Sequence, residues 1–339
     1  MQSNIIKESA KTCGFDLCGI AKATPLVIEK KRFQKALAQN FHAHKEYLER
    51  DIDKRFSPEL LLNNCKSVIV CGFNYNTECR MSCEESDSTC VGSDIKDEVC
   101  RSNSNLKFSK HSQLRDYHIF IKEKLEKLSR ILQAEYGTFN YKTTVDSANI
   151  SEKAWAVQAG IGYYGKNGII QTALGSFVFL GILLIDVEVD VYDNPNSKSC
   201  GTCRKCIAAC PTKAITIPYY VNCNQCIAHV TSNKKETDFS HIAKYGWLNA
   251  CDECQNACPN NFHPAINDEA IAMKAPFVEN KNTILETLTP ESFERYFKDT
   301  VIYPLKYEGL KLRLEAFSGV EKTNLIMKFK NKHVSLFPH

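Results

Sequence analysis

Four cysteines lie close together in CGTCRKCIAACP, residues 200–211, and their spacing indicates a metal centre. The first three are three residues apart, and the fourth, Cys210, follows four residues later, immediately before a proline. A run of this kind wraps a cubane iron–sulfur cluster, and in proteins with two clusters the fourth cysteine binds the other cluster. The run therefore predicts a second cysteine run further along the chain.

The second run is CDECQNACP, residues 251–259, which also ends in Cys-Pro. The cysteine that should open this run would fall at position 248, which is Leu248. Another cysteine must replace it, and Cys223 and Cys226, in VNCNQCIAH, are the candidates nearest in the sequence. From the residues alone, both remain open as the missing ligand.

Exchange of the fourth cysteine between the two clusters assigns a ligand set to each cluster. We expect cluster one to take Cys200, Cys203, Cys206 and Cys258, and cluster two to take Cys210, Cys251, Cys254 and one of Cys223 or Cys226. Two structural zinc sites are the alternative. Zinc typically takes two well-separated pairs of ligands, and it gives no reason for two Cys-Pro endings. The spacing therefore favours two [4Fe-4S] clusters.

The composition is that of an ordinary globular protein, with 339 residues, 43% of them hydrophobic and 24% charged. A membrane span needs an apolar run of about eighteen residues, and the sequence contains none. The first residues, MQSNIIKESAKTCGFD, lack the apolar core of a signal peptide. Seventeen cysteines without a secretion signal indicate metal ligation in a reducing compartment. We expect a cytoplasmic protein without a membrane anchor.

Positive charge is concentrated near the end of the chain. The net charge is +4, and residues 301–339 alone contain six Lys and one Arg against three Glu. A basic segment of this kind is typical of contact with a polyanion such as RNA. A solvated helix face would have the same composition, so charge alone leaves both interpretations open.

The elements that must position these cysteines alternate between helix and strand. Residues 1–75 predict helix, strand, helix, strand, with apolar strands at 15–23 and 66–75. Residues 77–107 are rich in Ser, Asp, Glu and Cys, which predicts an inserted, mobile surface loop. A long amphipathic helix is expected at 112–135.

A strand at 139–146, a helix at 151–160 and an apolar, hairpin-like stretch at 176–191 follow. The glycine-rich turn GIGYYGKNG, residues 160–168, is neither a dinucleotide fingerprint nor a P-loop. It follows a helix, and no Ser or Thr comes after its Gly-Lys. The alternation predicts an α/β (α+β) layer.

These patterns predict three domains. Residues 1–197 would form an α/β domain, and residues 198–262 a two-cluster, ferredoxin-like insert. Residues 263–339 are expected to be helical and basic, with the clearest helical pattern at 280–330. A two-cluster carrier needs far fewer residues than this chain has, so the first domain must have another task, and an α/β layer can hold a large cofactor.

Together the motifs resemble the epoxyqueuosine reductase family, over roughly residues 1–75 and 108–315. The N-terminal IIKESAKTCGFDLCGIAKA, the block EYLERDIDKRFSPELLLNNCKSVIVCGFNY and RDYH are similar to the family's segments. DSANISEKAWAVQAGIGYYGKNGII, residues 146–170, and GSFVFLG are the most specific matches. CIAHVT, residues 226–231, looks like the family's isolated cysteine segment, which favours Cys226 over Cys223.

The chain departs from the family in several places. Asn149 stands where the family usually has a proline, and His111 and Ser112 replace a Tyr-Ala pair. The acidic loop at 77–107 is extra, and we expect the C-terminal helical repeat of some members to be absent or vestigial here. None of these departures removes a cluster ligand, so they affect substrate contacts more than cofactor binding.

The resemblance implies a domain that binds cobalamin without its lower axial base. Electrons would pass from an external low-potential donor through the clusters to cobalt, and epoxyqueuosine in the anticodon loop of a tRNA would be reduced to queuosine. The cofactor would supply the difficult electronic step, and the protein would supply position, dryness and protons. We expect a monomer.

The resemblance also assigns roles to four residues. Arg55 aligns with a cofactor-contacting arginine, whereas alone it could be a surface charge. Ile170 and Leu180 match positions that line the corrin, although alone they are ordinary core residues. Asp146 matches the proposed proton donor, which a dry pocket would keep protonated. From its position alone Asp146 would be an N-cap, which stays ionised.

Two alternatives of other classes remain. One is another corrinoid iron–sulfur reductase that resembles the reductive dehalogenases, although the chain has no twin-arginine export signal. The other is a non-catalytic electron-transfer protein with two clusters. Cobalamin binding would exclude the second alternative, and dependence on tRNA would exclude the first.

Overall fold

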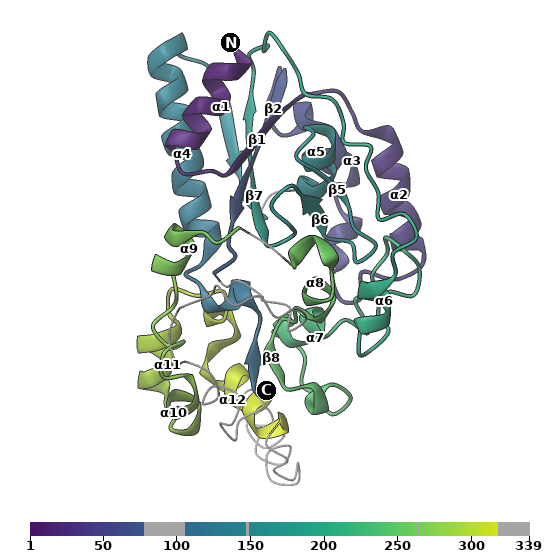
Figure 1. Cartoon of the computed structure of the whole chain (residues 1–339), viewed down its shortest axis with the longest axis vertical. Coiled ribbons are helices and arrows are strands. Elements are labelled where there is room, and N and C mark those ends of the chain that lie inside the picture. The colour runs from purple at the N-terminus through teal and green to yellow at the C-terminus, as the bar shows by residue number, and fades with distance from the viewer. Residues whose placement is uncertain (78–105, 147–148, 263–264, 318–339) are drawn as a thin grey trace, which may run out of the picture.

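The computed structural model describes residues 1–77, 106–146, 149–262 and 265–317. Its centre is a four-stranded sheet of strand order β1-β2-β7-β4, in which all three pairings are antiparallel. The strands are β1 (Leu17–Lys22), β2 (Ser67–Asn74), β7 (Val178–Ile185) and β4 (Tyr141–Thr144). Helices cover both faces of this sheet (Figure 1). The predicted strands near 15–23, 66–75 and 139–146 are confirmed.

Strands β2 and β7 form the middle of the sheet because their side chains are apolar on both faces. Every residue of β2 is buried, and β7 pairs with it along its whole length, for example at Ile69↔Leu183. The apolar stretch at 176–191 was predicted to be hairpin-like, and this is wrong. It contributes the single strand β7, because a strand between two others, covered on both faces, is apolar throughout.

Two helices cover one face of the sheet, α1 (Ser3–Thr12) and α4 (Tyr117–Tyr136). Helix α4 packs closely on β7 at Gly181, where an added Cβ would lie 2.7 Å from the Cγ2 of Ile121. The predicted helix at 112–135 begins later than expected. Asp116 caps its first turn by accepting a hydrogen bond from the His118 N–H at 3.0 Å, and residues 110–113 form a 3₁₀ turn instead.

The other face of the sheet is covered by three helices and a short hairpin. Helices α2 (Val27–Ala38), α3 (Ile52–Phe56) and α5 (Glu152–Gln158) lie on this side, with Trp155 of α5 fully buried. The glycine-rich segment forms the antiparallel hairpin β5 (Gly162–Tyr164) and β6 (Ile170–Thr172). Gly162 permits this close pairing, because an added Cβ would lie 2.5 Å from the Gln171 carbonyl oxygen.

The cysteine-rich residues 198–262, called the cluster segment below, contain only short elements. These are α6 (Lys205–Ala209), α7 (Ile227–Ser232), β8 (Trp247–Asn249) and α8 (Glu253–Asn256). Strand β8 pairs in parallel with β3 (Lys107–Phe108). The predicted loop at 77–107 therefore ends before Lys107, and its residues 78–105 lie outside the described part of the chain.

The described residues after the cluster segment are helical where they are regular. They form α9 (Asp268–Ala272), α10 (Lys281–Glu286), α11 (Pro290–Phe297) and α12 (Lys306–Phe317). The last three surround a core that contains Phe277 and Phe297, whereas Ala270 of α9 packs in the core beneath α1 and α4. The buried Arg313 of α12 joins this core to α7, because its Nε donates to the Thr231 carbonyl oxygen at 2.8 Å. The basic residues Lys328, Lys330 and Lys332 lie outside the described residues.

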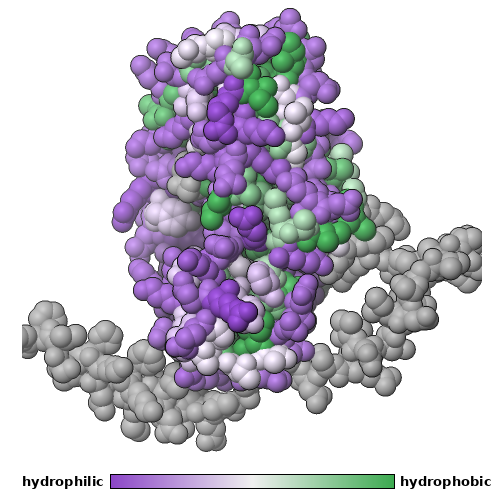
Figure 2. Space-filling view, turned by 90° about the vertical axis from the view of Figure 1, so that its left-hand side faces the viewer, coloured by the Kyte–Doolittle hydropathy of each residue, from purple (hydrophilic) through white to green (hydrophobic). Residues whose placement is uncertain are grey.

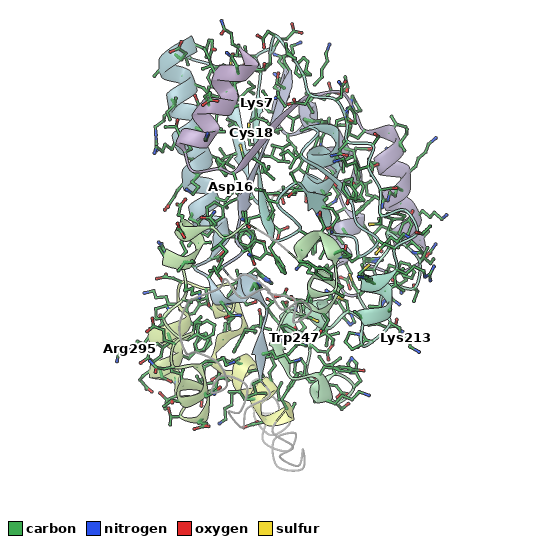
Figure 3. All side chains as sticks on the ribbon, viewed as in Figure 1. Lys7, Asp16, Cys18, Lys213, Trp247 and Arg295 are labelled. Carbon is green, nitrogen blue, oxygen red and sulfur yellow. The ribbon has the colours of Figure 1, made fainter. Side chains whose placement is uncertain are left out.

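The side of the molecule that carries α1 and α4 is mainly hydrophilic, with scattered hydrophobic side chains (Figure 2). No helix in the described ranges is long and apolar enough to cross a membrane. Asp16, labelled in Figure 3, lies between the sheet and α9. Its carboxylate accepts hydrogen bonds from the Asn74 N–H at 2.7 Å and the Asn267 side chain at 3.2 Å. These bonds tie the sheet to the C-terminal helices.

Candidate functional site

Two groups of cysteines form in the cluster segment, and the first contains Cys200, Cys203, Cys206 and Cys258. The pKa of Cys206 is raised first by burial and then by the neighbouring thiols of the other three. The structure thus brings the 251–259 run back to the first run, although Cys258 is over fifty positions away. This grouping agrees with the ligand set expected for cluster one.

The second group contains Cys254, Cys226, Cys251 and Cys210. Burial raises the pKa of Cys254 well above its usual value, and the neighbouring thiols of Cys226, Cys251 and Cys210 raise it further. Cys223 lies beside Cys226 and beside Lys153. Cys226 is thus a neighbour of Cys254, and its choice over Cys223 as the fourth ligand stays a prediction.

Among the described residues, no three His, Cys, Asp or Glu side chains converge closely enough to hold a single metal ion. A four-iron cube holds its thiolates farther apart than one ion does, because each thiolate binds a different corner. Convergence on a single ion is therefore not required of these cysteines.

Lys166 ties the glycine-rich hairpin to the first cysteine run. Its side chain is buried, and its Nζ donates to the carbonyl oxygens of Gly201 at 2.6 Å and Cys203 at 2.8 Å. Gln171, on β6, accepts a hydrogen bond from the Cys258 thiol at 3.4 Å. Sequence reasoning missed both residues, since nothing in GIGYYGKNG marks a lysine that binds carbonyl groups in a loop beyond position 200.

A cavity of about 450 Å³ lies between α2 and the cluster segment. All four cysteines of the second group line it, together with Cys223 and the aromatic side chains of Phe33, Phe41, Tyr164, Tyr219 and Tyr220. Two polar atoms of its lining, Nδ1 of His42 and Nδ2 of Asn167, are buried without a hydrogen-bond partner among the described residues. Such atoms cost stability unless a ligand binds them.

This lining fits the corrinoid that the resemblance implies. A corrin presents an apolar ring with amide groups around its edge, and the cavity offers aromatic faces with a few unpaired polar groups. Lys153 adds a donor at the cavity wall, where its Nζ bonds the Gly168 carbonyl oxygen at 2.9 Å. Displacement of water lowers the pKa of Lys153.

Arg55, on α3, is buried, so its interpretation as a surface charge is wrong. Its guanidinium donates to the Tyr47 carbonyl oxygen at 3.0 Å and to the Asn149 side-chain oxygen at 3.4 Å. Its Nε has no partner among the described residues. Burial lowers the pKa of Arg55. The arginine therefore braces the residues that follow β4 through its hydrogen bond to Asn149.

Ile170 and Leu180 belong to the same hydrophobic core, on the side of the sheet that carries α5. Ile170 is buried in β6, within the core that contains Trp155, and the partly buried Leu180 of β7 packs against the same core. Both positions are therefore part of the packing on that face, and neither side chain lines the cavity of about 450 Å³. Their proposed contact with a corrin stays a prediction.

Asp146 lies just after β4, in the loop of residues 145–151, of which 147–148 are not described. Its backbone is in the left-handed region, with φ of 47°, a conformation that non-glycine residues rarely adopt. Helix α5 begins at Glu152 with Ser151 as its N-cap, so the interpretation of Asp146 as an N-cap is wrong.

Tyr117 and His118, at the start of α4, contact Asp146. The Tyr117 hydroxyl donates to Oδ2 of Asp146 at 2.9 Å, and Nε2 of His118 lies 3.7 Å from the same oxygen. The Asp146 N–H donates to the Glu152 carboxylate at 2.6 Å. The sequence showed RDYH only as a segment similar to the family's, and the structure brings its Tyr117 and His118 to Asp146.

The contact with His118 holds the pKa of Asp146 down to about 2, against the opposing effect of burial. The side chain of Asp146 is 64% exposed. The prediction that Asp146 is a protonated acid in a dry pocket is therefore wrong for the protein without its cofactor. The carboxylate is exposed, and its neighbours favour the anion. Glu152 behaves in the opposite way, since burial and then the charge of Asp146 raise its pKa to about 8.

Known proteins are similar to this chain both around Asp146 and in the cluster segment. The family model described as "Epoxyqueuosine reductase QueG, DUF1730" matches residues 55–147, and "4Fe-4S double cluster binding domain" matches residues 199–261. The epoxyqueuosine reductase of Cyclobacterium marinum is 35% identical over 315 residues, covering 91% of this chain and 94% of that protein. That of Cellulophaga algicola is 34% identical and covers 92% and 97%.

Solved structures agree. An epoxyqueuosine reductase crystallised with an epoxyqueuosine-modified tRNA-Tyr stem loop has a TM-score of 0.77 and 26% identity, covering 93% of this chain and 80% of that chain. The Bacillus subtilis epoxyqueuosine reductase, solved with its aspartate-bearing catalytic loop swung out of the active site, has a TM-score of 0.72 and 25% identity, covering 93% and 80%. The chain therefore belongs to the epoxyqueuosine reductase family.

Proposed function

We propose that this protein reduces epoxyqueuosine to queuosine in tRNA, using two [4Fe-4S] clusters and cobalamin. The observation that carries the proposal is the similarity to curated epoxyqueuosine reductases over 91% of the chain. It is supported by the match of residues 199–261 to a double-cluster domain and by the cavity beside the second cysteine group. When bound, cobalamin supplies a strong two-electron reductant, and the clusters supply single electrons from a low-potential donor.

The residues of the chain would divide the work. Cys200, Cys203, Cys206 and Cys258 would hold one cluster, and Cys210, Cys226, Cys251 and Cys254 the other. The cavity wall, with His42, Lys153 and Asn167, would hold the corrinoid, and Arg55 would brace the neighbouring loop. Ile170 and Leu180 would form part of the apolar support on that face.

Asp146 would pass a proton to the oxygen that leaves the epoxide. Its exposed carboxylate can reach a substrate, and the catalytic loop of the Bacillus subtilis relative also carries an aspartate. The target base belongs to an unpaired loop of tRNA, which a protein can splay into a pocket. An isolated stem loop with the modified base should therefore be a substrate, as the complex of the related reductase suggests.

The test is anaerobic reconstitution with iron, sulfide and cobalamin, followed by incubation with a low-potential reductant and tRNA that contains epoxyqueuosine. We expect the modified nucleoside to lose one oxygen by mass spectrometry, and only when cobalamin is present. Binding of the tRNA should weaken as salt rises, because phosphate contacts release counterions. Unchanged nucleoside with fully loaded clusters and bound cobalamin would refute the proposal.

A further inference from the structure

Three ionisable groups lie in a row at the start of α4. Oδ1 of Asp116 accepts a hydrogen bond from Nδ1 of His118 at 2.6 Å, and Nε2 of the same ring lies 3.7 Å from Oδ2 of Asp146. Both ring nitrogens of His118 therefore face carboxylates. A neutral imidazole has one N–H, whereas the protonated ring donates from both nitrogens, so the arrangement suits the protonated ring.

Tyr117 holds the imidazole in this orientation. Its ring stacks on His118 with 4.1 Å between centroids, and on Phe179 of β7 at 4.3 Å with an angle of 4° between the rings. Its hydroxyl donates to Oδ2 of Asp146, the oxygen that His118 approaches. Stacking thus fixes the imidazole so that its Nε2 faces Oδ2 of Asp146.

The surrounding charges favour the protonated ring. Burial alone would lower the pKa of His118, but its contacts with Asp116 and then Asp146 outweigh burial and raise the pKa to about 9. A cation in the first turn of a helix is disfavoured by the helix dipole, so the two carboxylates must compensate for that position as well. The ring can exchange protons with water, because 38% of its side chain is exposed.

None of the other ionisable groups described around this row is placed and charged to supply a proton to the carboxylate of Asp146. Burial lowers the pKa of His111 to about 4, so His111 is neutral near pH 7. Glu152 faces the Asp146 backbone N–H, and Lys45 adds a more distant positive charge near Asp146. The phenol of Tyr117 stays protonated, because burial and the charge of Asp146 raise its pKa.

Reduction of an epoxide to an alkene consumes two electrons and two protons. Both carbon–oxygen bonds of the epoxide break, a carbon–carbon double bond forms, and the oxygen leaves as water. The electrons come from the external low-potential donor of the proposed function. Asp146 is ionised near pH 7, so it cannot deliver a proton that it does not first receive.

We propose that His118 supplies this proton to Asp146, and that Asp116 keeps His118 charged; the inference rests on the proposed function. As negative charge develops on the leaving oxygen, the proton on Nε2 of His118 passes by way of Oδ2 of Asp146 to that oxygen in one movement, because Asp146 alone would not take it from His118. His118 then takes a new proton from water and delivers the second proton of the reaction by the same route. His118 is thus a positioning residue that acts through Asp146. The 3.7 Å separation suits this role, since catalytic hydrogen bonds often tighten only when the substrate binds.

The test compares the pH dependence of turnover in three variants with that of the parent enzyme. His118→Asn keeps an amide N–H for Asp116 but cannot carry a proton to Asp146. Asp116→Asn keeps the oxygen that caps α4 but removes the charge that holds the proton on His118. His241→Asn changes an exposed histidine of the cluster segment and serves as the control.

The parent enzyme should lose turnover as pH rises through about 9, where His118 gives up its proton. In Asp116→Asn the pKa of His118 falls, so this loss should begin at lower pH. His118→Asn should lower kcat at least about tenfold with KM unchanged, somewhat less than a direct general acid contributes, and the loss near pH 9 should disappear. His241→Asn should match the parent at every pH.

A second measurement follows the proton without turnover. Nitrogen NMR of ¹⁵N-histidine-labelled protein, with its clusters oxidised, should show one imidazole that titrates near pH 9, is missing in His118→Asn and titrates lower in Asp116→Asn. If His118→Asn retains the parental kcat and pH profile, the proposal is wrong. An unchanged titration in Asp116→Asn would remove the role of Asp116. A parent enzyme that never reduces the tRNA would refute the proposed function instead, whatever the imidazole does.

Discussion

The cluster segment and the loop after β4 are organised in opposite ways. In the cluster segment the functional side chains are alike, and short local spacings bring most of them together. At Asp146 the partners are chemically different and come from two separate elements, the start of α4 and the start of α5. The cluster segment is therefore a local device, whereas the Asp146 site exists only because the sheet and α4 pack together.

The two regions should also differ in how they respond to substitution. A cluster needs four thiolates, so removal of one ligand removes a covalent bond to iron. The Asp146 site depends on contacts of 2.6–3.7 Å between charged and polar groups, which can be changed one at a time without unfolding the sheet. Substitutions in the two regions should therefore fail in different ways.

The largest effect is expected at Cys226. Cys226→Ala should lower the iron content from about eight to about four per chain, because one of two four-iron clusters loses a ligand, and should abolish turnover. Cys223→Ala is the matched control and should keep the full iron content. Iron analysis and electron paramagnetic resonance of anaerobic protein distinguish the two. A harmful Cys223→Ala change with an intact Cys226→Ala protein would reverse the ligand assignment.

Asp146→Asn should have the next largest effect, and it should spare the clusters. The amide can still accept the hydrogen bond from Tyr117, but it cannot pass a proton. We expect turnover to fall at least about a hundredfold, the lower end for general-acid contributions, with normal iron content and cobalamin binding. Measurement of kcat at saturating tRNA checks this. An active variant would assign the proton to another group or to water.

Lys166→Met should have the smallest effect. Lys166 belongs to the glycine-rich hairpin and contacts the first cysteine run. The substitution removes two hydrogen bonds to the carbonyl oxygens of Gly201 and Cys203 without touching a thiolate. The first cluster should form but should be lost several-fold faster to a chelator, since a hydrogen bond from a charged donor contributes about 1.5–3 kcal/mol. Lys198→Met, at an exposed lysine of the same segment, is the control. Equal rates of iron loss would show that Lys166 only packs.

The sequence by itself determined the cysteine pattern and the main elements. The spacing of the two runs predicted the pairing of Cys258 with the first run, because a thiolate ligand set has few geometric solutions. Apolar periodicity predicted β1, β2, β4 and α4, because burial of apolar side chains drives both kinds of element. The resemblance also separated Cys226 from Cys223, and the grouping around Cys254 agrees with that choice.

Only the tertiary structure decided what surrounds Asp146. Residue types near position 146 allowed an N-cap or a buried acid, and the structure has neither, because α5 begins six residues later and His118 lies within 3.7 Å. It likewise decided that β7 is one central strand and that Lys166 reaches the loop beyond position 200. These outcomes depend on contacts between segments far apart in the chain, and the pKa of an ionisable group follows from such neighbours rather than from its local sequence.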